Sequence, residues 1–117
     1  MIGIDIVSIA RFNRVLQTYY ASSFLRRVFS NNELKLLDER LNHSRVKSLA
    51  GRFAVKEAVI KASQGELKLD DLANIETSKG KNGEPLVHIN VKGFSGHFEI
   101  SLSHDGDYAI AVAYKTK

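Results

Sequence analysis

Residues 52–62 read RFAVKEAVIKA, and a helix built from this segment is apolar on almost all of its faces, as expected for the centre of a fold. At about 100° per residue, two apolar stripes follow this helix, one through Val46, Leu49, Phe53 and Ile60 and the other through Val55, Ala58, Val59 and Ala62. A narrow polar seam remains at Arg45, Arg52, Lys56 and Ser63. Glu57 lies near the middle of the first stripe, where a carboxylate is costly unless it is paired, hydrogen-bonded or bound to a metal. Glu57 is therefore a candidate site residue.

The second half of the chain changes from a helical period to alternation. Residues 75–77 and 86–91 flank an Asn-Gly turn, and residues 98–104 and 108–114 flank an Asp-Gly-Asp turn, so two β-hairpins are expected. The last hairpin has a face of small methyl groups at Ala109, Ala111 and Ala113, against which we expect the central helix to pack closely. The sequence thus predicts an α+β fold, with an antiparallel sheet packed around a long buried helix.

The first half predicts a strand and further helices. Residues 2–7 alternate as a half-buried strand with Asp5 in its middle. Ser8 is a plausible N-cap for a helix with the apolar face Ile9, Phe12, Leu16 and Tyr19. Ser30 and Glu33 form a capping box that opens another helix, with apolar positions Leu34, Leu37 and Leu41. The central helix should follow residues 42–44 and end at Gly65, before a connection at residues 67–72. With no internal repeat or linker, residues 1–117 are expected to form one domain.

Composition limits the classes of function. The 117 residues contain no cysteine, which excludes disulfides and thiolate metal sites and favours a hard, oxygen-bound metal. No stretch is long enough to span a membrane, and the first residues lack the features of a signal peptide, so a cytoplasmic location is expected. The net charge of +4 suggests an acidic partner. Four arginines early in the chain could bind such a partner or could lie on solvated helix faces: Arg11, Arg14, Arg26 and Arg27.

Two carboxylates suggest chemistry on phosphate. Asp5 and Glu57 could share one divalent cation, with water and phosphate oxygens completing the octahedron that magnesium prefers, while Lys61 could hold a phosphate. Each of these functional interpretations has a structural alternative of equal weight. Glu57 and Lys61 could form an ion pair one helical turn apart, and Asp5 could cap the following helix. Periodicity alone cannot bring Asp5 to Glu57.

Two further places could contact phosphate. His104 ends a strand beside a tight turn, although a histidine with a purely structural role is more common there. Residues 80–83, Gly-Lys-Asn-Gly, could present backbone N–H groups and an ammonium to phosphate, or could simply be a hairpin turn.

In combination, these motifs resemble the holo-acyl-carrier-protein synthases, the small 4′-phosphopantetheinyl transferase family. The resemblance rests on residues 3–7 with Arg11, on Phe29 with Glu33, on residues 52–62, and on residues 101–104 with 108–109. These segments occur in the family's order and with compatible spacing over essentially the whole chain.

The resemblance implies transfer of 4′-phosphopantetheine from coenzyme A to a serine of apo acyl carrier protein, with adenosine 3′,5′-bisphosphate as the other product. It implies a magnesium-dependent enzyme of fatty acid biosynthesis, and hence of lipid metabolism, with the phosphopantetheinyl transferase fold. Asp5 and Glu57 match the family's metal-binding carboxylates, and Lys61 matches the lysine at the reacting phosphate. A homotrimer with shared active sites is expected, so coenzyme A would contact Lys61 together with Arg52, Asn82, Gly83, Pro85 and His104. Arg11 and Arg14 would meet the acidic carrier protein.

The chain departs from many relatives at two places, and two other classes of function are considered. Ser8 stands where relatives often have an acidic residue, and Gly65 is a single glycine where relatives often have two. A basic nucleic-acid-binding module would explain the charge but leaves the buried Glu57 unexplained. A magnesium phosphohydrolase would explain the carboxylates but would need no protein serine.

Overall fold

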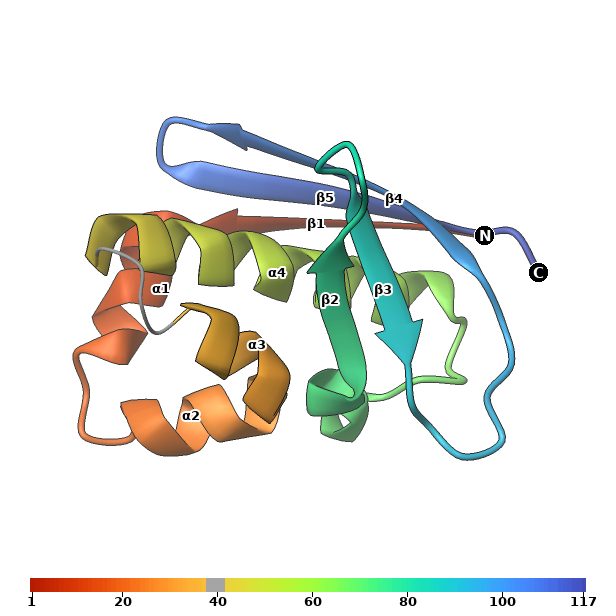
Figure 1. The fold of residues 1–117 in the computed structure, drawn as a ribbon, viewed down its shortest axis with the longest axis horizontal. Helices are drawn as coiled ribbons and strands as arrows, with labels where there is room; N and C mark the ends of the chain where they lie inside the picture. Colours follow the sequence, from red (N-terminus) through yellow and green to blue (C-terminus); the bar gives the residue numbers. More distant parts are fainter. Residues whose placement is uncertain (38–41) are drawn as a thin grey trace.

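The computed structural model describes residues 1–37 and 42–117, and a long helix forms its centre (Figure 1). This helix, α4 (Asn42–Ala62), lies against an antiparallel sheet whose strand order is β1 (Ile2–Ser8), β5 (Tyr108–Lys115) and β4 (Phe98–Asp105). Its other sides are covered by α1 (Ile9–Leu16), α2 (Ala21–Val28), α3 (Asn31–Leu37), the 3-10 helix η1 (Leu69–Asn74) and the hairpin β2 (Ile75–Lys79) with β3 (Pro85–Ile89). The predicted α+β architecture is therefore confirmed.

Small residues bring the sheet and α4 into close contact. Ala109, Ala111 and Ala113 are fully buried, and in the register of β1 with β5 Ala113 lies opposite Gly3. A Cβ on Gly3 would fall 2.7 Å from the Ala62 nitrogen and closer still to the Ala58 carbonyl oxygen. The strand can approach the helix backbone only because residue 3 has no side chain, and the expected packing of the alanine face on the helix is confirmed.

Two predicted helix starts are also confirmed, whereas α4 begins at Asn42 and not after residues 42–44 as expected. The Ser8 side chain accepts a hydrogen bond of 3.2 Å from the Arg11 N–H, as an N-cap residue does. Ser30 and Glu33 form both bonds of a capping box, from the Ser30 N–H to Glu33 Oε1 at 2.9 Å and from the Glu33 N–H to Ser30 Oγ at 3.1 Å.

Several local expectations were wrong. Tyr19 is 99% exposed, because α1 ends at Leu16 and does not carry its apolar face that far. Helix α4 ends at Ala62 rather than Gly65, since Gln64 and Gly65 adopt positive φ angles of 55° and 89°. Part of the expected connection at residues 67–72 is the 3-10 helix η1, and α2 was not expected. Leu41, expected in the apolar face after Ser30, lies outside the described residues.

Three of the four residues of the predicted polar seam are buried. Lys56 and Ser63 are 0% exposed and Arg52 is 9% exposed, whereas Glu57 is only partly buried. Arg52 and Lys56 therefore bond to buried polar groups of other elements instead of facing solvent.

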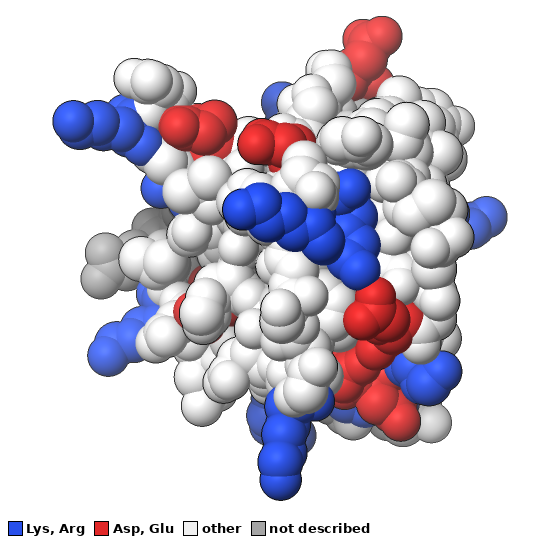
Figure 2. Space-filling model, turned by 90° about the vertical axis from the view of Figure 1, so that its right-hand side faces the viewer, with Lys and Arg blue, Asp and Glu red and all other residues white. Residues whose placement is uncertain are grey.

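The outer face of the sheet is apolar and exposed. Ile2, Ile4 and Ile6 of β1 are 67%, 58% and 59% exposed, and Tyr108 and Tyr114 of β5 are about half exposed. Figure 2 shows the molecule from the right-hand side of Figure 1, where acidic and basic side chains lie next to each other. Within the described ranges, no helix is long and apolar enough to cross a membrane.

Candidate functional site

The close approach of β1 to α4 brings Asp5 together with Lys61. Lys61 Nζ donates hydrogen bonds to the Ile4 carbonyl oxygen at 2.9 Å and to Asp5 Oδ1 at 3.1 Å. The N-cap of α1 is Ser8, so the alternative that Asp5 caps the following helix is wrong. The cation that the sequence placed one turn after Glu57 thus forms its ion pair across to the strand.

Glu57 lies close enough to feel both charges. Burial raises the pKa of Glu57 above its ordinary value, the Asp5 carboxylate raises it further, and the Lys61 ammonium opposes them. The fold therefore creates the pair of carboxylates that periodicity could not join. Two nearby carboxylates, one of them partly desolvated, are destabilised by mutual repulsion, and a bound cation would relieve that repulsion.

Asp5, Glu57 and Lys61 line one cavity of about 440 Å³. Ser8 and Arg11 extend its polar wall, and its apolar wall comes from α1, α2 and α4 through Phe12, Val15, Phe24 and Phe53. No group of three or more histidine or acidic side chains that could hold a metal occurs among the described residues. Two carboxylates nevertheless fit magnesium, which usually keeps several waters and takes one or two protein carboxylates together with substrate phosphates.

The two predicted carrier-protein residues both lie on α1. Arg11 and Arg14 are exposed, and Arg11 lines the carboxylate cavity. Arg14 lies in the last turn of α1. Arg26 and Arg27 of α2, with Phe53 and Glu57 of α4, line an adjoining hollow of about 580 Å³.

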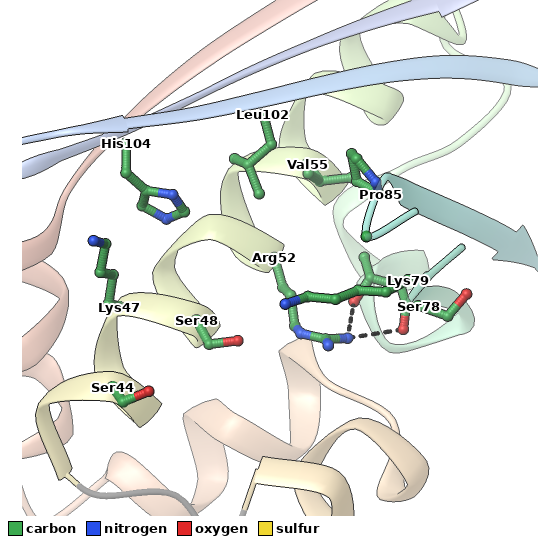
Figure 3. Close-up of a pocket in the computed structure, with 12 residues that line it drawn as sticks. Ser44, Lys47, Ser48, Arg52, Val55, Ser78, Lys79, Pro85, Leu102 and His104 are labelled. Atoms are coloured by element: carbon green, nitrogen blue, oxygen red, sulfur yellow. Dashed lines mark hydrogen bonds between the residues drawn. The ribbon is translucent and has the colours of Figure 1, made fainter. Parts of the chain in front are cut away.

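Most of the predicted coenzyme A residues line a different cavity, of about 330 Å³ (Figure 3). Arg52, Gly83, Pro85 and His104 all line it. Asn82 is not among its lining residues, and its exposed N–H bonds to Glu84 Oε1 at 2.9 Å. Lys47 and Lys79, which are not among the residues predicted from the sequence, add two ammonium groups to the wall. The lysines around the Gly-Lys-Asn-Gly turn were the available signal for this basic wall.

His104 is an unusual member of this wall. Its Nε2 is buried and has no hydrogen-bond partner within the described part of the chain. The ring lies over Gly51, where a Cβ would come 2.9 Å from Nε2. A buried ring nitrogen without a partner, in a wall with two lysines and an arginine, fits an anionic ligand such as a phosphate.

The two cavities lie on opposite sides of α4. Arg52 and Glu57 are five residues apart, which is about 140° around a helix. Ser44, Ser48, Arg52 and Val55 face the 330 Å³ cavity, whereas Phe53, Glu57 and Lys61 face the carboxylate cavity. One chain therefore separates the predicted coenzyme A residues from the predicted metal ligands, with Lys61 on the metal side.

A buried network that the sequence did not predict lies beside the site. Lys56 and Glu33, both 0% exposed, form an ion pair of 2.6 Å. Burial lowers the pKa of Lys56, and the neighbouring Glu33 carboxylate opposes this effect. The sequence predicts a capping box at Glu33 and places Lys56 in the polar seam, but no pattern in the sequence pairs residues 23 positions apart.

Comparisons with known proteins identify the family and the fold of the chain. Residues 1–113 match the family model described as the 4′-phosphopantetheinyl transferase superfamily. The holo-[acyl-carrier-protein] synthase of Clostridium tetani is 37% identical, over 96% of this chain and 91% of its own. The structure of the Helicobacter pylori holo-[acyl-carrier-protein] synthase in complex with coenzyme A has a TM-score of 0.80 and 35% identity, and the match covers 99% of this chain and 100% of that one. The Neisseria meningitidis synthase has a TM-score of 0.83 and 28% identity, with coverage of 99% and 97%. This chain belongs to the holo-[acyl-carrier-protein] synthase family of 4′-phosphopantetheinyl transferases.

Proposed function

We propose that this enzyme transfers 4′-phosphopantetheine from coenzyme A to a serine of apo acyl carrier protein and uses magnesium to do so. The observation that carries the proposal is the meeting of Asp5, Glu57 and Lys61 in one cavity of a chain whose relative binds coenzyme A. Fatty acid biosynthesis in the cytoplasm is the setting that we propose for it.

The proposed roles follow from the charges in the carboxylate cavity. Asp5 and Glu57 hold the magnesium ion, which when bound supplies positive charge for the pyrophosphate oxygens. Lys61, already held over the strand by Ile4 and Asp5, offers its ammonium to the transferred phosphate. These groups act mainly by orientation and electrostatic stabilisation, as is usual in phosphoryl transfer.

The proposed reaction needs no covalent enzyme intermediate. The serine oxygen forms a bond to the phosphorus that bears the pantetheine arm, and the bond from that phosphorus to adenosine 3′,5′-bisphosphate breaks. The serine proton passes to a base, for which Glu57 and a water molecule are both candidates.

We further propose that the active site is shared between copies of the chain in a homotrimer. Coenzyme A would reach the Arg52 and His104 cavity of one copy and the Asp5 and Glu57 cavity of its neighbour, because α4 separates these cavities within one chain. The exposed isoleucines of β1 supply an apolar face for such an assembly. Sedimentation of active enzyme as a monomer only would contradict this proposal.

The carrier protein is proposed to dock on α1. Arg11 lies at the edge of the carboxylate cavity and Arg14 lies one turn further along the helix. Complementary charge at this position would speed and orient the encounter with an acidic protein.

The deciding experiment follows the mass of the carrier. Purified enzyme is incubated with coenzyme A, magnesium and apo carrier protein, and the carrier is then measured by mass spectrometry. We expect a gain of one phosphopantetheine group on the carrier serine, and no gain on a carrier with serine replaced by alanine. Absence of the gain, where a control transferase modifies the same carrier, would refute the proposal. Release of free phosphopantetheine without modification of the carrier would instead indicate a phosphohydrolase.

A further inference from the structure

The buried ion pair of Lys56 with Glu33 takes no part in the proposed chemistry, yet all of its polar atoms have partners. Lys56 Nζ donates to Glu33 Oε1 at 2.6 Å, to the Val28 carbonyl oxygen at 2.7 Å and to the Leu72 carbonyl oxygen at 2.9 Å, which uses all three ammonium protons. A fully satisfied network of this kind holds its members in one arrangement.

The second carboxylate oxygen of Glu33 carries the network to β2. Glu33 Oε2 accepts the Thr77 N–H at 2.9 Å and also accepts the Thr77 hydroxyl. An ionised carboxylate can only accept, so the single hydroxyl proton of Thr77 points toward Glu33. The lone pairs of that hydroxyl oxygen are then free to accept from another donor.

That donor is Arg52, at the wall of the 330 Å³ cavity. Arg52 Nη1 donates to Thr77 Oγ1 at 2.8 Å and to the Thr77 carbonyl oxygen at 2.9 Å, as the dashed lines in Figure 3 show. Thr77 itself lines the cavity, beside Ser78 and Lys79. Glu33 thereby orients the hydroxyl that anchors one edge of the guanidinium.

We propose that Glu33 and Thr77 are positioning residues, which fix Arg52 so that its guanidinium is ready for an anionic group of coenzyme A. This inference rests on the proposed function, because it takes coenzyme A as the ligand of this cavity. Arg52 lies across α4 from Glu57 in the same chain, so its contribution should be to ligand binding. Loss of such binding raises KM and leaves kcat unchanged.

Variants at Thr77 separate positioning from stability. Thr77→Val has nearly the same volume and keeps the backbone bonds but has no hydroxyl, whereas Thr77→Ser keeps the hydroxyl. We expect Thr77→Val to raise the KM for coenzyme A about tenfold, as suits the loss of a hydrogen bond to a charged group, with kcat within about twofold of the wild type. Thr77→Ser should retain a KM within about twofold of the wild type. Ile75→Val, a fully buried change on the same strand, is the control that lowers stability without changing the bonds among Glu33, Thr77 and Arg52.

A double variant tests whether the effect passes through Arg52. In an Arg52→Gln background, Thr77→Val should cause no further rise in KM. An unchanged KM in Thr77→Val, an equal rise in Thr77→Ser, or a further tenfold rise in the Arg52→Gln background would each overturn the inference. If Thr77→Val does not fold, Arg52→Gln decides, and a wild-type KM in that variant overturns the inference. Failure of the wild-type enzyme to modify the carrier would count against the proposed function instead.

Discussion

Replacement of Lys56 by methionine should destabilise the fold strongly. The loss should exceed that caused by replacing an exposed lysine of the same helix. Methionine has a similar length and volume, so Lys56→Met creates no large cavity. It removes the ion pair with Glu33 and leaves the Val28 and Leu72 carbonyl oxygens without this donor. Loss of one partner of a fully buried pair costs about 3–5 kcal/mol, because the other charge remains buried.

The expected loss is large enough to measure without ambiguity. For a chain of this length, each kcal/mol corresponds to about 4 °C in Tm, so Lys56→Met should melt about 12–20 °C lower than the wild type. Urea unfolding followed by circular dichroism would give the free energy of unfolding directly. Lys47→Met, an exposed change on the same helix, is the matched control and should stay within about 0.5 kcal/mol of the wild type.

A second substitution tests the reason for the loss. In the double variant Lys56→Met with Glu33→Gln, the buried carboxylate is gone, so the total loss should be about 1–3 kcal/mol smaller than the sum of the two single losses. A loss below about 1 kcal/mol in Lys56→Met would refute the view that this pair anchors α4. Strict additivity in the double variant would refute the view that the stranded carboxylate causes the loss.

The remaining predictions concern the two cavities. Glu57→Gln and Asp5→Asn should fold normally and lose most turnover at ordinary magnesium concentrations, so full activity in a transfer assay would refute their proposed role as metal ligands. Because the pKa of Glu57 is raised, the metal-free folded state binds a proton on Glu57 more tightly than the unfolded chain does. This proton binding stabilises the fold fully below pH 4.5, the ordinary pKa, and the stabilisation is lost as the pH rises through the pKa of Glu57 in the folded state. Magnesium should therefore raise Tm more at pH 8 than at pH 5 in a thermal melt, and an equal rise would contradict this. Gly51→Ala should gain up to about 1 kcal/mol of helix propensity but push His104 aside, so the KM for coenzyme A should rise without loss of stability, and should not rise further in a His104→Ala background. Arg11→Glu should raise the KM for carrier protein, more at low salt than at high salt, and spare coenzyme A binding; an unchanged salt profile counts against it.

Secondary structure was predicted correctly from the sequence where short-range interactions determine it. The N-cap at Ser8 and the capping box at Ser30 were predicted because short side chains bond to backbone groups only two or three residues away. The strands of the last hairpin were predicted from strict alternation. Helix α2 was missed because its N-cap, Tyr20, makes no side-chain bond to the helix and so leaves no sign of where it begins.

Periodicity failed on α4 because no position from residue 49 to residue 60 is fully exposed. In a surface helix the polar residues mark the wet face, but here Lys56 is completely buried while Glu57, one residue later, reaches a cavity. Which of two adjacent charges is buried depends on partners far along the chain, and Glu33 lies 23 residues away. The sequence could therefore identify Glu57 as unusual, but it could not show that Lys56 is the more deeply buried of the two.

The buried pair and the candidate site are connected through the rotation of α4. Close packing of its apolar side chains fixes the rotation of α4, and the three bonds of Lys56 to α2, α3 and η1 add specific contacts on one side. On the other side, Gly3 lets β1 approach the backbone of α4 so closely that a Cβ on residue 3 would clash at Ala58 and Ala62. With both sides fixed, Glu57 must face Asp5, and Arg52, about 140° away, must face the opposite cavity. The same rotation thus places the proposed metal ligands and the proposed coenzyme A wall, so a change that loosens Lys56 should weaken both sites together.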